Sequence, residues 1–166
     1  MTQQQGSEND IKGQYHEITP EQLAYDLTLF ANFITQTCVT KPRLFGVPRG
    51  GLIIAGYLAH LLDIRDVMSC PLDMLRAYVH LNVIKPTDLI IEDIYDSGNT
   101  YEEIRKDIYN VRVLHLYCKR RVPEPFGGFP QAVRPLDLPH ETFVRFPWEK
   151  IADEATSRLR RRIYDI

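Results

Sequence analysis

The chain has 166 residues, of which 44% are apolar and 25% are charged, and its formal net charge is −2. This length supports one domain with a real core, and the near-neutral charge gives no general case for binding nucleic acid. No apolar run approaches the length that crosses a membrane, so we expect no membrane association. Three scattered cysteines without CxxC spacing favour reduced thiols over disulfides or a zinc site, and we expect a cytoplasmic protein.

The N-terminal residues 1–14 are polar, carry no apolar stretch typical of a secretory signal, and are expected to be disordered. A single domain is expected over 15–166. Its first helix is predicted to start at Thr19-Pro20-Glu21-Gln22, where the threonine caps and the proline takes the first helical position. Apolar residues at helical spacing then predict one buried stripe, formed by Leu23, Leu27, Phe30 and Ile34.

A strand, a glycine turn and a helix come next. Leu44-Phe45-Gly46-Val47 predicts a short buried strand, and residues 52–62 predict a buried helix. The turn between them is Pro48-Arg49-Gly50-Gly51. Paired glycines allow the backbone to approach a ligand closely, and the planar guanidinium of Arg49 suits phosphate oxygens.

The segment from Asp66 to Thr87 is less regular. Asp66 to Ser69 predicts a third short strand, while residues 74–84 fit either a helix or an irregular hairpin. Arg76 and Tyr78 are the candidates here for contacts with a ligand, and we expect both to be structural.

A buried strand followed by an acidic cluster is the most informative stretch. Leu89-Ile90-Ile91 predicts the strand, because three apolar β-formers follow one another. Glu92, Asp93 and Asp96 place three carboxylates directly after it. Carboxylates accept hydrogen bonds from hydroxyl groups, so this cluster suits a polyol.

Small polar residues, Ser97-Gly98-Asn99-Thr100, lead from this cluster into a helix predicted over 101–108. Thr100 and Glu103 match a capping box, so the helix is expected to begin at Thr100. Free N–H groups at a helix N-terminus attract anions. A ligand that is both polyol and phosphate fits this arrangement, with Mg²⁺ offsetting the repulsion between charges.

The run from Glu92 to Thr100 resembles the ribose-phosphate signature of the type I phosphoribosyltransferases. The resemblance implies that Glu92 and Asp93 hold ribose hydroxyls and that Asp96 manages the proton on the attacking nitrogen. It implies a 5′-phosphate site formed by Ser97, Gly98, Asn99 and Thr100.

Residues 45–54 resemble the pyrophosphate loop of purine phosphoribosyltransferases, particularly the xanthine-guanine branch. The resemblance implies that Arg49, Gly50 and Gly51 hold pyrophosphate. In that family the loop often carries a cis peptide, which here would fall at Pro48–Arg49.

A longer apolar run, residues 111–118, predicts the next strand. His115 lies inside it and is assigned no role. Lys119 is the first residue beyond it, at the edge where open parallel sheets bind ligands. By resemblance, this position is that of the family's purine-reading lysine. Residues 123–139 are rich in proline and glycine and predict an ordered connector.

Residues 142–149 alternate in a way that predicts a strand, and they resemble the hood of xanthine-guanine phosphoribosyltransferases. Phe143 would stack on the purine, and the backbone of Val144 would read the base edge. Glu149, with Asp93, would help hold metal-bound pyrophosphate. Residues 151–166 predict a terminal helix, whose arginine cluster is interpreted as a solvated face and not as a nucleic-acid site.

These elements predict an α/β fold with a mostly parallel central sheet, helices on both faces and a small C-terminal hood near 120–150. The resemblance implies a pentosyltransferase that moves the 5-phosphoribosyl group from phosphoribosyl pyrophosphate to a 6-oxopurine, with Mg²⁺. A homo-oligomer, dimer or tetramer, is expected. The alternative is a non-catalytic regulator with this fold that senses a nucleotide and binds nucleic acid or a protein.

Overall fold

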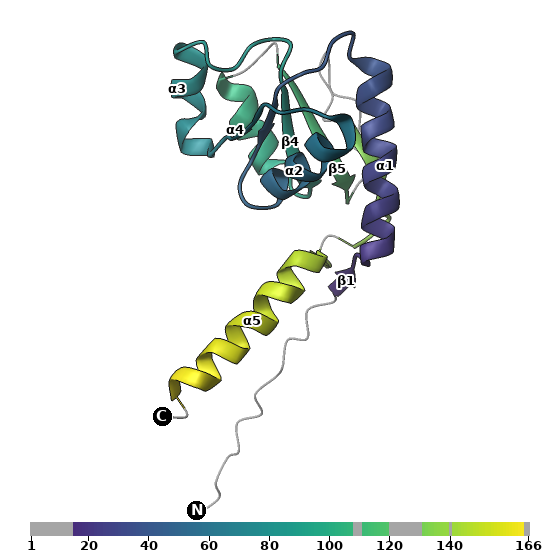
Figure 1. The fold of residues 1–166 in the computed structure, drawn as a ribbon, viewed down its shortest axis with the longest axis vertical. Helices are drawn as coiled ribbons and strands as arrows, with labels where there is room; N and C mark the ends of the chain where they lie inside the picture. The colour runs from purple at the N-terminus through teal and green to yellow at the C-terminus, as the bar shows by residue number, and fades with distance from the viewer. Residues whose placement is uncertain (1–14, 108–110, 120–130, 140, 165–166) are drawn as a thin grey trace, which may run out of the picture. The chain divides into compact units, whose positions relative to one another are not determined.

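The computed structural model describes residues 15–107, 111–119, 131–139 and 141–164 (Figure 1). They form two compact units, the larger within residues 20–140 and the smaller from residues up to 19 together with those from 141 onward. Each unit is described by itself, and the single domain expected over 15–166 stays a prediction. The expected disorder of 1–14 concerns residues outside the described ones. None of the described helices is long and apolar enough to cross a lipid bilayer.

The larger unit is built on a parallel sheet with the strand order β3-β2-β4-β5-β6. Every neighbouring pair in it is parallel, as predicted. The strand β4 is central and longer than predicted: it includes Glu92 and Asp93, which were expected to follow it, and Asp96 comes directly after its end. These acids therefore lie toward the carboxyl end of the middle strand. The strands are β2 (Leu44–Gly46), β3 (Val67–Ser69), β4 (Leu89–Tyr95), β5 (Arg112–Cys118) and β6 (Gln131–Pro135).

The strand β6 corrects one prediction. Residues 131–135 lie inside the segment predicted to be a connector, yet they pair with β5 from Leu114↔Gln131 to Cys118↔Pro135. Proline and glycine dominate the composition of that segment and conceal the strand. The proline stands at the end of β6, a position where a missing N–H is tolerated.

Helices cover both faces of the sheet, as predicted (Figure 1). Phe45 and Ile90 point into a core shared with Tyr101 and Ile104 of α4. Gly46 faces the other way, because a Cβ on it would lie 2.4 Å from the Cα of Leu52 in α2. Since successive strand residues point to opposite faces, α4 and α2 cover opposite sides. The helices are α1 (Pro20–Thr37), α2 (Gly50–Leu62), α3 (Leu75–His80) and α4 (Asn99–Asp107).

Two helix predictions are settled directly. The stripe predicted in α1 is buried at all four positions. The ambiguous region contains a 3₁₀ turn at Leu72–Met74 followed by α3, so the helical alternative is correct for part of it.

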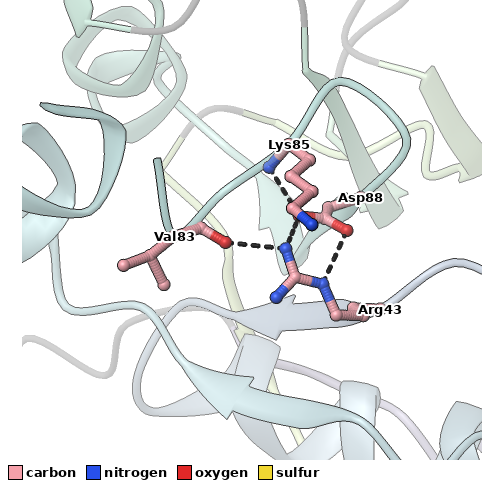
Figure 2. Close-up of polar contacts among 4 residues, drawn as sticks. All are labelled: Arg43, Val83, Lys85 and Asp88. Atoms are coloured by element: carbon pink, nitrogen blue, oxygen red, sulfur yellow. Dashed lines mark hydrogen bonds and ion pairs between the residues drawn. The ribbon is translucent and has the colours of Figure 1, made fainter. Parts of the chain in front are cut away.

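An arginine clamps the loop that follows α3 to the start of β2 (Figure 2). Arg43 donates from Nε and Nη2 to the two carboxylate oxygens of Asp88, at 3.0 and 2.6 Å, and from Nη2 to the carbonyl of Val83 at 2.7 Å. The N–H of Lys85 donates to the same carboxylate at 2.6 Å. Hydrogen bonding to Asp88 raises the pKa of Arg43. Asp88 is only 2% exposed, so these donors replace the water that its charge has lost.

The smaller unit pairs two distant strands and ends in a long helix. The strand β1 (Tyr15–Glu17), which was not predicted, runs parallel to β7 (Phe143–Arg145). The predicted strand over 142–149 stops at Arg145, because Pro147 begins the helix α5 (Pro147–Tyr164). The N–H of Phe146 donates to Glu149 Oε2 at 3.0 Å, a local contact that caps this helix.

We predict that Arg43→Ala lowers the free energy of unfolding by about 2–3 kcal/mol, because it leaves the buried carboxylate of Asp88 short of donors. Denaturant unfolding at neutral pH measures this effect. Lys41→Ala is the control: it removes an exposed pair with Asp63 at 3.2 Å and should cost less than about 1 kcal/mol. Equal losses for the two variants would contradict the clamp.

Candidate functional site

The glycine turn after β2 lies directly against the end of β4. A Cβ on Gly50 would lie 1.8 Å from Oδ2 of Asp93, and one on Gly51 would lie 2.3 Å from the carbonyl oxygen of Ile91. The peptide between Pro48 and Arg49 is cis, as the resemblance implied. A side chain at position 51 would meet backbone and one at position 50 would meet the Asp93 carboxylate, so the predicted pyrophosphate loop lies against the predicted ribose site.

Arg49 precedes α2 and is exposed. Within the described part of the chain, its guanidinium makes no hydrogen bond or ion pair. A planar fork of donors at the entrance to a helix N-terminus suits phosphate oxygens. The position agrees with the role predicted for it, which stays a prediction.

The two adjacent acids of the motif point to opposite faces of the sheet. Asp93 lies beside Gly50, on the α2 side. Glu92 lies on the α4 side, where its Oε2 is 2.6 Å from Nε2 of His115 on the neighbouring strand. Glu92 is 6% exposed and His115 is fully buried. Sequence reasoning treated the acids as one pair and missed the histidine.

Asp96 and Lys119 come together as the two strands end. Lys119 Nζ donates to Asp96 Oδ2 at 2.8 Å, and the Lys119 N–H donates to the carbonyl of Tyr95 at 3.1 Å. Lys119 is 5% exposed, whereas the Asp96 side chain is 45% exposed. The predicted acid–base residue and the predicted purine-reading residue are therefore in direct contact.

The residues predicted to bind the 5′-phosphate line a small pocket at the start of α4, together with Glu92, Ile94, Tyr95, Asp96 and Tyr101. Gly98 has a φ of +89°, and a Cβ there would lie 2.6 Å from the hydroxyl oxygen of Tyr95. Because a carboxylate and a helix N-terminus share this pocket, it suits a ligand that carries hydroxyl and phosphate groups.

The local start of α4 differs from the prediction. The helix begins at Asn99, not at Thr100, and Glu103 pairs with Lys106 at 2.6 Å instead of closing a capping box. Ser97 Oγ accepts a 3.4 Å hydrogen bond from the Asn99 N–H. A flexible lysine three residues along the helix is a nearer partner for the exposed Glu103 carboxylate than the helix start.

Three predicted site residues belong to the smaller unit. Phe143 is 61% exposed, and its ring lies 6.0 Å from that of Tyr15. Val144 is half-buried in the middle of β7, and Glu149 caps α5 as described. Their roles toward a purine and a metal stay predictions.

The described side chains fit a magnesium ion held mainly by its substrate. Within the described ranges, no three His, Cys, Asp or Glu side chains converge on one point. Asp93 does lie against the glycine turn. Mg²⁺ is commonly bound by one or two carboxylates together with phosphate oxygens and water, and Asp93 supplies such a carboxylate.

Known phosphoribosyltransferases resemble this chain in sequence and in fold. No family model matches the sequence. The xanthine-guanine phosphoribosyltransferase of Idiomarina loihiensis is 28% identical over 120 residues, which are 64% of this chain and 70% of the relative. The xanthine-guanine-hypoxanthine phosphoribosyltransferase of Helicobacter pylori superposes with a TM-score of 0.61 at 20% identity, over 86% of this chain and 99% of that one.

The chain has the type I phosphoribosyltransferase fold. A hypothetical protein from Neisseria gonorrhoeae with bound ppGpp shares it, with a TM-score of 0.62 at 18% identity, over 89% of this chain and 96% of that one. A phosphoribosyltransferase and a ppGpp-bound protein thus superpose on this chain almost equally well. Because one fold can host different functions, the fold alone does not define the function of this protein.

We predict that Gly51→Ala destabilises the fold by about 2–4 kcal/mol, because the new methyl group meets backbone that cannot rotate away. Gly50→Ala meets a side chain and should instead displace the Asp93 carboxylate at a smaller cost in stability. Gly56→Ala in the middle of α2, where a Cβ meets nothing within 4 Å, is the control and should be neutral or stabilising. Thermal unfolding of the three variants measures this order. A Gly56→Ala variant less stable than the other two would contradict it.

Proposed function

We propose that this protein is a purine phosphoribosyltransferase that uses phosphoribosyl pyrophosphate and a 6-oxopurine. The observation that carries the proposal is the contact between the glycine turn and Asp93, since it joins a candidate pyrophosphate cradle to a candidate ribose site. The phosphate pocket at the start of α4 lies at the end of the same strand. Similarity to the xanthine-guanine enzymes supports the same class.

The proposed reaction exchanges two bonds at the anomeric carbon of ribose. A ring nitrogen of the purine forms a bond to this carbon, the bond to the pyrophosphate oxygen breaks, and the nitrogen loses its proton. Arg49 and the loop amides would stabilise charge on the departing pyrophosphate. Asp96, exposed beyond β4, would accept the proton. Mg²⁺ held near Asp93 would neutralise pyrophosphate charge when bound.

Purine recognition is assigned to Lys119, Phe143 and Val144. An ammonium group has three donors and no acceptor, so Lys119 can donate to Asp96 and to a 6-oxo group together. Adenine carries an amino group at that position. The amino group and the ammonium group of Lys119 are both donors, so neither would find an acceptor in the other. The exposed ring of Phe143 supplies a stacking face, and the backbone of Val144 would read the base edge. A homo-oligomer remains the expected assembly.

A nucleotide sensor is the second candidate. The Neisseria protein of the same fold was solved with ppGpp bound, a guanosine nucleotide with phosphate groups at both ends. A sensor would use the same phosphate pocket but would need no proton acceptor. The two candidates therefore differ in turnover and in the importance of Asp96.

Pyrophosphate release separates the two functions. Purified protein is mixed with phosphoribosyl pyrophosphate, Mg²⁺ and, in turn, guanine, hypoxanthine, xanthine and adenine. Release that depends on a 6-oxopurine supports the enzyme. Tight binding of ppGpp without any release, measured by calorimetry on the same preparation, would replace the enzyme with the sensor.

We predict that Asp96→Asn lowers kcat about 10²-fold or more, because the amide keeps the size of the side chain but cannot accept the proton. The affinity for phosphoribosyl pyrophosphate should change little. Asp63→Asn is the control: this exposed residue ends α2 with a φ of 51°, a conformation that asparagine accepts readily. An unchanged kcat with a raised KM would remove Asp96 from proton transfer.

We predict that the wild type prefers guanine over adenine by at least about 10²-fold in kcat/KM, and that Lys119→Met reduces this ratio at least tenfold. Methionine preserves the buried stem of the lysine and removes its donors. Lys41→Met, far along the chain in an exposed pair, controls for the loss of a positive charge. Adenine turnover equal to that of guanine in the wild type would refute the assignment of Lys119.

A further inference from the structure

Two buried polar side chains face each other on adjacent strands, just below the phosphate pocket. Glu92 on β4 and His115 on β5 are register partners, and their Oε2 and Nε2 atoms are 2.6 Å apart. Neither side chain is appreciably exposed to solvent. Glu92 nevertheless lines the pocket that the phosphate-binding residues form. Glu92 therefore contacts the histidine through Oε2 and also contributes to the candidate ligand pocket.

The direction of the hydrogen bond follows from the surroundings of the ring. Nδ1 of His115 is buried and has no hydrogen-bond partner within the described residues. An empty acceptor costs less than an unpaired buried N–H, so the proton belongs on Nε2, which donates to Glu92. The bond thus engages Oε2 of Glu92 and leaves Oε1 for another donor.

Two tyrosine rings fix the orientation of the imidazole. The Tyr95 ring meets it edge-on at 5.4 Å and 84°, and the Tyr101 ring lies 6.0 Å away at 57°. The two tyrosines also contact each other at 5.9 Å. Tyr95 comes from the end of β4 and Tyr101 from the first turn of α4, so the elements that form the pocket also hold the histidine.

Stability does not explain this pair. A buried acid and a buried imidazole with one unpaired nitrogen both lose hydration, and apolar residues of similar size usually pack at least as well. The buried hydrophobic cluster on this face of the sheet includes Ile90, Val113 and Ile104, which come from the same two strands and from α4. The polar pair follows Ile90 and Val113 along these strands, toward the pocket.

We propose that His115 is a positioning residue that holds Glu92 in place to accept hydrogen bonds from the ribose hydroxyls of the ligand. This inference rests on the proposed function, since it requires a ribose phosphate in the pocket. A buried hydrogen bond that orients a ligand-binding side chain keeps such a site in its productive geometry. His115 itself does not touch the ligand.

Nucleotide binding tests the proposal without requiring turnover. Calorimetry compares guanosine 5′-monophosphate with its 2′,3′-dideoxy analogue, so that only the hydroxyls differ. The wild type should prefer the hydroxylated nucleotide about tenfold or more. His115→Leu should bring this ratio close to one, whereas His115→Gln, whose amide can donate from a similar position, should keep it within about threefold of the wild type.

Val113→Ala is the matched control, because it removes volume from the same face of β5 without touching Glu92. It should lower thermal stability and leave the hydroxyl preference unchanged. The double variant Glu92→Leu/His115→Leu should keep the stability of the wild type and lose the preference. A His115→Leu protein that retains the wild-type preference would overturn the proposal.

The wild type alone gives a further readout if the single variants fail to fold. The Nε2–H signal of His115, identified by its proximity to the Tyr95 and Tyr101 rings, should shift in the NMR spectrum when guanosine 5′-monophosphate is added but not with inorganic phosphate. No shift would overturn the proposal.

A wild type that prefers the hydroxylated nucleotide but releases no pyrophosphate would refute the catalytic function and leave the role of His115 standing. A wild type without the preference would overturn the role of His115.

Discussion

The close contact between the glycine turn and the end of β4 is the constraint on which the site depends. The N–H of Val47 donates to the carbonyl of Ile91, and the N–H of Leu52 donates back to Val47, so the turn is fixed to the sheet at both ends. A side chain at Gly51 would meet the backbone of the acidic strand, and one at Gly50 would displace the Asp93 carboxylate. Because both loops are attached to one rigid sheet edge, their spacing does not depend on a moving segment.

Three polar side-chain pairs join β4 to its two neighbours at successive positions along the strands. Arg43 and Asp88 connect the starts of β2 and β4, and His115 pairs with Glu92 between β5 and β4. Lys119 and Asp96 form a third pair beyond the two strand ends. The Arg43–Asp88 pair anchors a loop, whereas the other two pairs belong to the candidate site. The same sheet thus uses similar chemistry for stability at one edge and for ligand contacts at the other.

Sequence patterns predicted the local elements of the fold and missed the contacts that depend on how the strands pair. Both strand–turn–helix loops were predicted, since glycines and small polar residues mark them directly. The contact of Lys119 with Asp96 agrees with the rule that parallel strands bring their carboxyl ends together. Glu92 and His115 are each the fourth residue of their strands, but only the pairing Leu89↔Arg112 shows that they meet. The short strands β1 and β6 carry polar residues, and the chain near them gives no sign of their partners.

The pairing of β1 with β7 has a consequence for synthesis on the ribosome. Tyr15 leaves the exit tunnel well before its partner Phe143 is made. All five strands of the larger sheet are complete before β7 is made. The nascent chain can therefore assemble the larger sheet during translation before the pair of β1 and β7 forms.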